Sequence, residues 1–339
     1  MLTIGFSIPT NSLNPHPLSV LCIATVLHAG DVTGPNIFLI ISDDELFGFV
    51  AEQAAAEKPM FIWWAPLVPH TPHNPPERLL AKFKDAEVPV PSYIPTENHE
   101  RFKQATRKFW AMGTWLDEGV AELIAKLKSV GEYENTLFIF YVDNGWAIGC
   151  YAKNSAFEKG LRTPMILSWP DRIPAGKRIN DPHYALDLHA TILDYAGLEP
   201  TPGIVSRTLR PVIEGNSGRR HEALFGTAFA HHNYDYKGPV PRTPNRDLIA
   251  LYIREDKWKF IYYPQSLGKN NDRYFRMDRM LLPDPIERAA GDVDLFDLEN
   301  DPYEMHNLAN DPAHASRIAA MERRVFDWWK ETNGKSLSE

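Results

Sequence analysis

The chain has 339 residues, with 36 Lys and Arg against 44 Asp and Glu, and a formal net charge of −8 at pH 7. This length allows two domains, or one large domain with an appendage. The acidic balance and the lack of a basic block argue against nucleic acid as a partner. Cys22 and Cys150 lie too far apart in the sequence to indicate a disulfide framework, and they have no metal-binding spacing.

Residues 1–30 are predicted to be a leader. Leu18–Leu27 is an apolar run of signal-peptide length, followed by the small residues Ala29 and Gly30. Residues 1–16 contain no Lys or Arg, so the basic segment that usually opens an export signal is lacking. The sequence therefore leaves the localisation open, with export to the periplasm or the exterior as the alternative that the leader suggests. The run is too short to span a bilayer, and we predict no membrane span.

Asn36–Ser42 is apolar on both faces, which is typical of a strand inside a parallel sheet that helices cover on each side. The run ends in Asp43 and Asp44. Adjacent carboxylates repel each other unless a cation or an arginine lies between them. Phe49–Lys58 then predicts a short helix, because it is rich in alanine and free of Gly and Pro, and Met60–Ala65 predicts the next strand.

Pro66–Pro76 is too rich in proline for regular structure, and we expect a rigid loop at the end of that strand. His70 and His73 lie in it, at a spacing that zinc sites use. Taken alone, each histidine is more typical of an exposed loop residue than of a metal ligand.

Asn98–Ser129 repeats apolar residues at steps of three and four, which predicts a long helix with a packing role and no chemistry. Gly113 and Gly119 can bend or divide this helix, and Gly131 is expected to end it.

Leu137–Val142 predicts another strand, which stops at Asp143, Asn144 and Gly145. Asp-Asn-Gly is ordinary turn chemistry, and taken alone it favours a turn. A strand that ends in a carboxylate and an amide also presents two oxygen donors at the carboxyl edge of a sheet, where open α/β folds bind ligands. The similar ending of the first strand favours this second interpretation.

The predicted fold class is α/β, with a mostly parallel mixed sheet flanked by helices over residues 31–215 and a smaller C-terminal α+β subdomain over residues 216–339. The main domain continues with a strand at Met165–Trp169 and a helix at His183–Ala196. The subdomain is predicted to contain a hairpin, a further strand and a closing helix, at Leu248–Ile253 with Trp258–Tyr263, at Val293–Leu298 and at Ile318–Trp328.

Taken in this order, the segments resemble the sulfatase family of the alkaline-phosphatase superfamily, from Pro35 to the C-terminus. The resemblance implies an alkaline-phosphatase-like fold and a sulfuric ester hydrolase that acts on a small-molecule or glycan sulfate ester. The segments that carry it are Asn36–Asp44, Lys58–Pro66, Pro69–Pro72, Asp143–Gly145, Lys153–Pro164, Ile166–Pro174 and Leu295–Leu308.

The resemblance also implies a site. It implies that His70 and Lys153 bind the sulfate group and act in catalysis by assisting the leaving oxygen. It further implies that Ca²⁺ is bound by oxygen donors from Asp43, Asp44, Asp143 and Asn144. Carboxylate and amide oxygens suit a hard cation. A dication, an ammonium and an imidazole can together stabilise the negative charge that develops during sulfate ester hydrolysis.

The chain departs from the family at the nucleophile. In the family this is a cysteine matured to formylglycine, in a Cys-x-Pro/Ala-x-Arg motif between the acidic pair and the second strand. The motif is absent here: the segments that begin at Cys22 and Cys150 lack its arginine, and Ser168–Arg172, which fits a serine version, lies in a later strand. The sequences before and after Gly48 resemble two separated parts of the family sequence. This predicts an internal deletion there, either in the gene itself or through a faulty gene model.

Several interpretations stay open at this point. The first is a sulfatase that has lost its nucleophile and is inactive or impaired. The second is a metal-dependent phosphate or phosphonate ester hydrolase of the same superfamily, and the third is a calcium-dependent binder of sulfated glycans without catalysis. A fourth is that the deletion leaves apolar surface uncovered and the chain aggregates.

Overall fold

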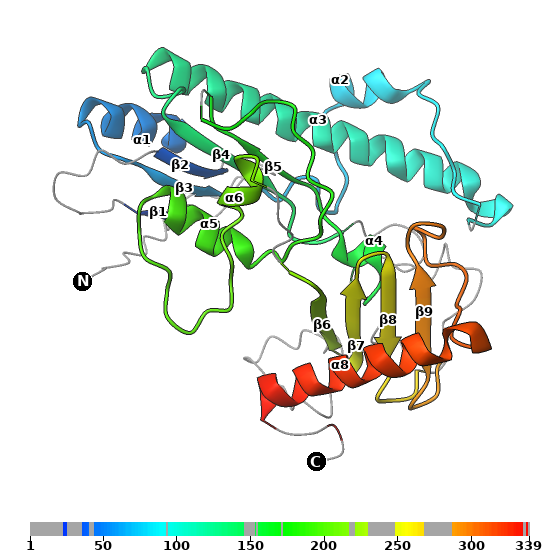
Figure 1. Ribbon diagram of the computed structural model, residues 1–339. Helices are drawn as coiled ribbons and strands as arrows, with labels where there is room; N and C mark the ends of the chain where they lie inside the picture. Colours follow the sequence, from blue (N-terminus) through cyan, green and yellow to red (C-terminus); the bar gives the residue numbers. More distant parts are fainter. Residues whose placement is uncertain are drawn as a thin grey trace, which may run out of the picture. The chain divides into compact units, whose positions relative to one another are not determined.

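We describe a computed structural model of the chain, shown in Figure 1. It describes residues 23–25, 36–40, 44–92, 94–145, 153, 155–170, 172–216, 221–229, 248–267, 287–334 and 337. The chain divides into two compact units. The first comprises Met1–Pro89, Glu100–Tyr141 and Pro164–Arg220, and the second comprises Val90–His99, Val142–Thr163 and His221–Glu339. The predicted leader and the boundary at 215/216 stay predictions.

The first unit is built on a five-stranded sheet with the strand order β1-β3-β2-β4-β5. The central strand β2 pairs in parallel with both β3 and β4, whereas the outer strands β1 and β5 are antiparallel to their neighbours. This confirms the predicted mixed sheet with a parallel centre. The strands are β1 Ile23–Thr25, β2 Asn36–Ile40, β3 Phe61–Trp64, β4 Thr136–Tyr141 and β5 Met165–Ser168.

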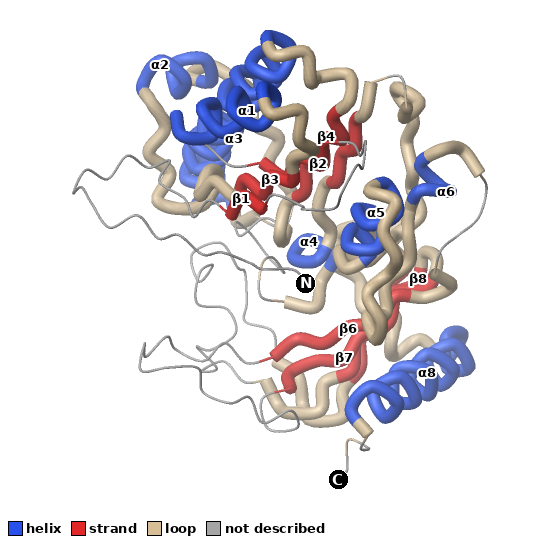
Figure 2. Tube along the Cα trace, turned by 90° about the vertical axis from the view of Figure 1, so that its left-hand side faces the viewer, coloured by secondary structure: helices blue, strands red, loops and turns tan. Residues whose placement is uncertain are grey.

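Helices cover both faces of this sheet, because the strands are apolar in both directions. Ile62 and Phe138 pack against α1 (Asp44–Ala55) and α3 (His99–Ser129), and the tube in Figure 2 shows these two helices together on one side of the strands. Leu137 and Ile139, the alternate residues of β4, pack with Leu188 and Tyr195 of α5 and Ile213 of α6. The remaining helices outside the C-terminal part are α5 Asp187–Tyr195, α6 Arg210–Ile213, and the single turns α2 Glu77–Leu80, η1 Ala81–Phe83 and η2 Thr96–Asn98.

Two helices differ from the sequence expectation in extent. Helix α1 begins at Asp44, the second residue of the acidic pair, rather than at Phe49. Helix α3 runs through both of its glycines without a break. Gly119 has a packing reason, since a Cβ there would lie 3.0 Å from the Trp64 ring. Gly131 follows the helix with a φ of +79°, as expected for a residue that ends a helix.

The second unit has a four-stranded antiparallel sheet in the order β6-β7-β8-β9. The hairpin β7–β8 and strand β9 were predicted, and β6 is an addition that the structure makes. Figure 1 shows the closing helix α8 running across this sheet. The elements are β6 Leu224–Phe229, β7 Leu248–Glu255, β8 Trp258–Tyr262, β9 Val293–Asp297, η3 Pro312–His314 and α8 Ala315–Asn333, with the single turn α4 Glu158–Leu161 earlier in the chain.

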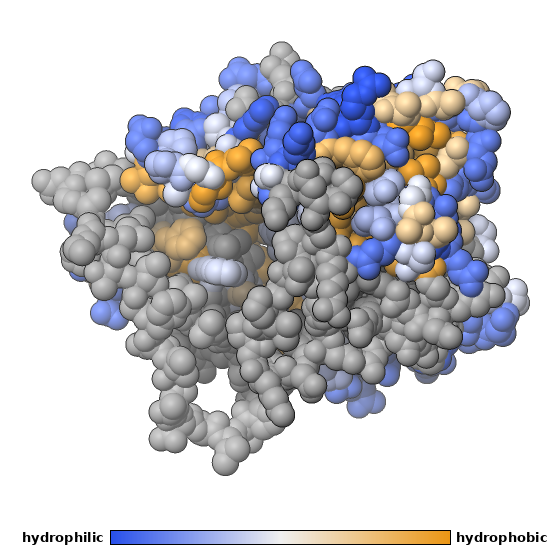
Figure 3. Space-filling model, turned by 90° about the horizontal axis from the view of Figure 1, so that it is seen from below, coloured by the Kyte–Doolittle hydropathy of each residue, from blue (hydrophilic) through white to orange (hydrophobic). Residues whose placement is uncertain are grey.

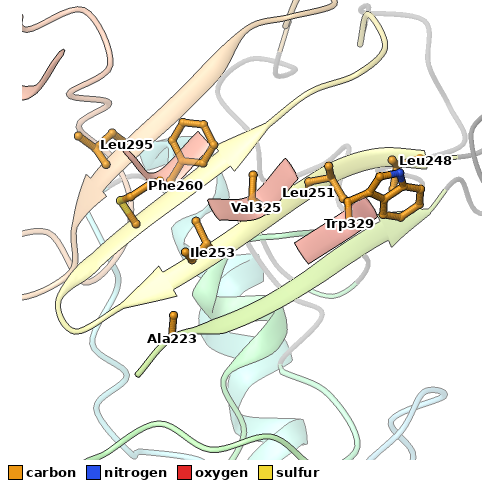
Figure 4. Packing of buried hydrophobic residues seen from close by; sticks show 9 residues of the cluster. Ala223, Leu248, Leu251, Ile253, Phe260, Leu295, Val325 and Trp329 are labelled. Carbon is orange, nitrogen blue, oxygen red and sulfur yellow. The ribbon is translucent and has the colours of Figure 1, made fainter. Parts of the chain in front are cut away.

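The two faces of the second sheet are packed by different segments. On one face, side chains from three strands meet α8, and Figure 4 shows Leu251, Phe260 and Leu295 with Val325 of this helix. On the other face, Ala156 and Phe157, just before α4, pack with Ile261 and Phe296. The segment that follows Lys153 is therefore anchored on this sheet.

The described surface is mixed in character. Figure 3 shows hydrophilic and hydrophobic side chains next to one another where described residues reach that face. Trp63 of β3 is 48% exposed and Ile166 of β5 is 59% exposed, so apolar side chains of the first sheet lie open to solvent. Exposure of these side chains does not measure aggregation, and the aggregation hypothesis stays a prediction. None of the helices within the described ranges has both the length and the apolar composition needed to cross a membrane.

Helix α8 gives a first prediction. Val325 is fully buried between α8 and the sheet, so Val325→Ala is expected to lower the free energy of unfolding by about 2 kcal/mol through lost burial and a residual cavity. Chemical denaturation of the purified variant measures this change. Arg323→Ala, at an exposed position of the same helix, is the control, with a change below about 0.5 kcal/mol. Equal losses in the two variants would contradict the packing of α8.

Candidate functional site

Three of the predicted polar segments leave the first sheet at one edge. Strand β2 is parallel to β3 and β4, with Leu39 in register with both Trp63 and Ile139. The carboxyl ends of these strands therefore lie at a common edge, where α/β folds place their ligands. Asp43 lies outside the described residues. Asp44 is the first residue of α1, and its side chain is also outside the description.

The loop after β3 holds the two histidines in different environments. His70 is exposed, and its Nδ1 lies 2.8 Å from the carbonyl oxygen of Thr71. His73 is half-buried and packs edge-on against Phe109 of α3, with 5.9 Å between the ring centroids. Burial lowers the pKa of His73, and the nearby His70 and Lys108 lower it further. His70 is thus the exposed loop histidine expected from the sequence, whereas His73 contributes to packing.

The Asp143–Gly145 segment is held by its backbone. The Gly145 N–H donates to the carbonyl oxygen of Gly160 at 2.8 Å. A Cβ at Gly145 would lie only 1.8 Å from the carbonyl oxygen of Lys159, so glycine is required for this approach. Asp143 is exposed and Asn144 is half-buried. Within the described part of the chain, neither side chain makes a hydrogen bond or an ion pair.

These free oxygen atoms suit a hard cation such as calcium. The segment cannot be the complete site. Among the described residues, no three His, Cys, Asp or Glu side chains gather as a metal-binding group, and Asp43 lies outside them. Asp44 and His70 belong to the first unit, while Asp143, Asn144 and Lys153 belong to the second. Their convergence on one ion stays a prediction.

A buried charge cluster lies in the second unit. Lys259 of β8 is fully buried, and its ammonium lies 3.0 Å from Glu158 Oε1 and 3.7 Å from Glu304 Oε1. Arg254 also pairs with the Glu158 carboxylate. Glu304 Oε2 accepts a hydrogen bond from the backbone N–H of Glu158 at 2.6 Å. We call these four residues, Glu158, Arg254, Lys259 and Glu304, the buried charge cluster.

The two carboxylates of the cluster differ in electrostatics. Burial penalises the charge of Glu158, but Lys259 and Arg254 overcome this penalty and lower the pKa of that carboxyl. Among the described cations, Glu304 pairs only with Lys259, and at the longer distance. Burial therefore dominates and, with the repulsion from Glu158, raises the pKa of Glu304 to about 7. The pKa values of the two acids are thus shifted in opposite directions within one cluster, as expected when the acids differ in their cationic partners.

Hydrogen bonds give a structural role to the segment Leu295–Leu308, which resembles the family's C-terminal signature. Asn307 Oδ1 accepts from the Leu295 N–H at 3.0 Å, and its amide donates to Asp294 Oδ1 at 2.6 Å. Leu308 N–H donates to the Leu295 carbonyl at 2.8 Å. These contacts fold the segment back onto β9 and place Glu304 in the cluster.

No role for this cluster was predicted from the sequence. Glu158 and Glu304 lie in segments that carry the family resemblance, but they are 101 and 45 residues away from their partner Lys259 in the chain. One signal was available: Lys259 interrupts the otherwise apolar and aromatic strand Trp258–Tyr262. A lysine on a buried face of a strand predicts a buried acidic partner, although it does not say which one.

Comparison with known proteins places the chain in context. The family described as Sulfatase matches residues 27–198, just over half of the chain, and the family described as N-sulphoglucosamine sulphohydrolase, C-terminal, matches residues 146–283. An ulvan-active sulfatase of Formosa agariphila is 27% identical over 292 residues, which are 84% of this chain and 54% of that protein. The chain thus spans about half the length of this relative.

Two solved structures are similar in fold. A phosphonate monoester hydrolase of Agrobacterium radiobacter has a TM-score of 0.64 at 18% identity, over 89% of this chain and 64% of that chain. A protein solved in complex with its substrate D-glucosamine-2-N,6-O-disulfate has a TM-score of 0.61 at 17% identity, over 86% and 71%. These similarities confirm the predicted alkaline-phosphatase-like fold class.

The raised pKa of Glu304 predicts how stability depends on pH. Between its ordinary pKa of 4.5 and about 7, the folded state binds this proton more tightly than the unfolded state does. The free energy of unfolding therefore falls as pH rises through this window, by up to about 3 kcal/mol. Glu304→Gln imitates the protonated acid and is expected to remove most of this fall. Denaturant midpoints at pH 5 and 7.5 test it, and equal pH slopes for both proteins would refute the assignment.

Proposed function

Because the chain belongs to the sulfatase family, we propose that it keeps a calcium-dependent pocket for sulfate esters but hydrolyses them weakly or not at all. One observation carries this proposal. The family match runs over residues 27–198, yet this span contains no Cys-x-Pro/Ala-x-Arg segment that could be matured to formylglycine. The internal deletion that the sequence predicts near Gly48 would fall within the matched span.

The cation is proposed to be bound by Asp43, Asp44, Asp143 and Asn144. The exposed Asp143 carboxylate and the half-buried Asn144 amide support this, since both oxygens are free within the described residues and offer the hard ligands that calcium takes. When bound, calcium supplies positive charge to the sulfate oxygens.

His70 and Lys153 are proposed to bind the sulfate group and assist the leaving oxygen. A carbonyl oxygen only accepts, so the Nδ1–H of His70 donates to the Thr71 carbonyl. This leaves Nε2 as the nitrogen that can face a ligand. When the imidazole is protonated, Nε2–H can give a proton to the bridging oxygen as the S–O bond breaks. The ammonium of Lys153, half-buried, would neutralise a non-bridging oxygen.

Without formylglycine, the attacking group would have to be water. Water is a weaker nucleophile, and no second residue here is proposed to activate it. The residues above would then bind the ester and stabilise its charge without the covalent step that divides one difficult reaction into two easier ones. Binding of the sulfate ester is therefore expected to be retained where its hydrolysis is weak or lost.

The substrate class is proposed to be a sulfated glycan or a small-molecule sulfate ester. One relative is named as an ulvan-active sulfatase, and one similar structure holds a disulfated glucosamine. The likeness to a phosphonate monoester hydrolase favours a second candidate, hydrolysis of phosphate or phosphonate esters with metal-bound water.

Calcium binding has a direct test. Calcium at 100 times its Kd is expected to stabilise the unchanged chain by about 3 kcal/mol, because it binds only the folded state. Asp143→Ala should lose this gain, which thermal unfolding with calcium or with EDTA measures. Asp327→Ala, which removes an exposed carboxylate on α8, should keep it. A gain of the same size in both variants would argue against a cation at Asp143.

Catalysis is tested separately. With an aryl sulfate and calcium, the unchanged chain is expected to give no more turnover than Asp143→Ala. Turnover clearly above that variant would refute the proposed impairment. Hydrolysis of an aryl phosphonate, together with about two equivalents of bound zinc, would favour the second candidate instead. Calcium-dependent retention on a sulfated polysaccharide without product would support a binding role.

A further inference from the structure

We infer that Glu304 and Lys259 are positioning residues for the loop that carries Asp143 and Asn144. The inference rests on the proposed function, since it assigns these two residues to support of the proposed calcium site. It is carried by a continuous series of contacts inside the second unit, from the C-terminal signature through α4 to Gly145.

The first contact joins the signature to α4. The Glu304 carboxylate accepts the backbone N–H of Glu158, the first residue of α4, at 2.6 Å. Glu304 is 3% exposed and its φ is +57°, a left-handed conformation that is unfavourable for a residue with a side chain. Its backbone N–H donates to the Asp301 carbonyl at 3.1 Å, and the Asp301 side chain accepts from the His306 N–H at 2.7 Å. This turn aims the Glu304 side chain at α4.

The second contact is the ion pairing that offsets the repulsion between the two buried acids. Glu158 and Glu304 are both buried acids, and side by side they would repel each other. The Lys259 ammonium lies within 4 Å of both carboxylates, and Arg254 adds a second positive charge at Glu158. Lys259 thereby fixes the distance between the signature and the start of α4.

The third contact reaches the proposed site. Gly160, two residues after Glu158, accepts the Gly145 N–H through its carbonyl oxygen, and the backbones approach so closely that no side chain fits at residue 145. A shift of α4 must therefore move Gly145, and with it the adjacent Asn144 and Asp143. Groups that orient the ligands of a metal commonly set its affinity.

Hydrogen exchange of the Gly145 amide tests this positioning without calcium. The measured quantity is the exchange rate at Gly145 divided by the rate at the amides of β8, by NMR in EDTA. Glu304→Leu is expected to raise this ratio about tenfold, because the α4 contact opens locally. Glu304→Gln keeps an acceptor oxygen for the Glu158 N–H and should restore most of the protection.

Val325→Ala is the matched control, since it weakens the same sheet from its opposite face. Global destabilisation moves both rates together, so its ratio should stay within about twofold of the unchanged chain. If Glu304→Leu does not fold, Arg254→Met replaces it and should still raise the ratio above that control. A ratio equal to that of Val325→Ala would overturn the inference.

A calcium titration of the same variants separates the inference from the proposed function. Weakening of the calcium Kd by about tenfold in Glu304→Leu, with Val325→Ala unchanged, would support both. If the unchanged chain binds no calcium, the proposed cation site is refuted, and the Gly145 exchange ratio still decides whether Glu304 and Lys259 position the loop.

Discussion

The second unit depends on the burial of one ammonium group. Lys259 has no exposed surface, and an unpaired charge in such a position would cost several kcal/mol. The Glu158 carboxylate at 3.0 Å and the more distant Glu304 offset this cost. They come from segments far apart in the sequence, since Glu158 is the first residue of α4 and Glu304 follows β9. The sheet, α4 and the C-terminal signature are therefore stabilised together, and none of the three can shift without leaving a buried charge unpaired.

This arrangement changes how the family signature is understood. Asn307 joins the segment to β9 through Leu295 and Asp294, and Glu304 joins it to α4. Each contact has a folding reason that needs no substrate. The contacts of this segment thus account for its place in the fold of the second unit, and they say nothing about turnover. Its link to the proposed site is indirect, through the Gly160 carbonyl and the Gly145 amide.

Local patterns were sufficient for most of the elements. The apolar stripe of α3, the hairpin β7–β8 and the strand endings at the first sheet were predictable, because periodicity and turn chemistry act within a few residues. Strand β6 was not predicted. It pairs along its length with β7, but Phe225, Gly226 and Thr227 do not alternate clearly between apolar and polar side chains. The buried charge cluster could not be assembled from the sequence, since only the fold brings Glu158, Lys259 and Glu304 together. Convergence of Asp44 and Asp143 depends on both units and stays a prediction.

The residues that remain informative about chemistry are those without a structural role. Glu158, Lys259 and Glu304 would be retained by folding alone, whether or not the chain acts on an ester. The Asp143 carboxylate is different, because it is exposed and makes no hydrogen bond or ion pair within the described residues. Gly145 accounts for the close backbone approach at this loop, so packing places no demand on an acid two residues earlier. A carboxylate followed by an amide suits a turn, and beyond a strand that is parallel to the one before Asp44 it also suits the proposed cation. The absence of a Cys-x-Pro/Ala-x-Arg segment in this chain is consistent with the proposed separation of ester binding from hydrolysis.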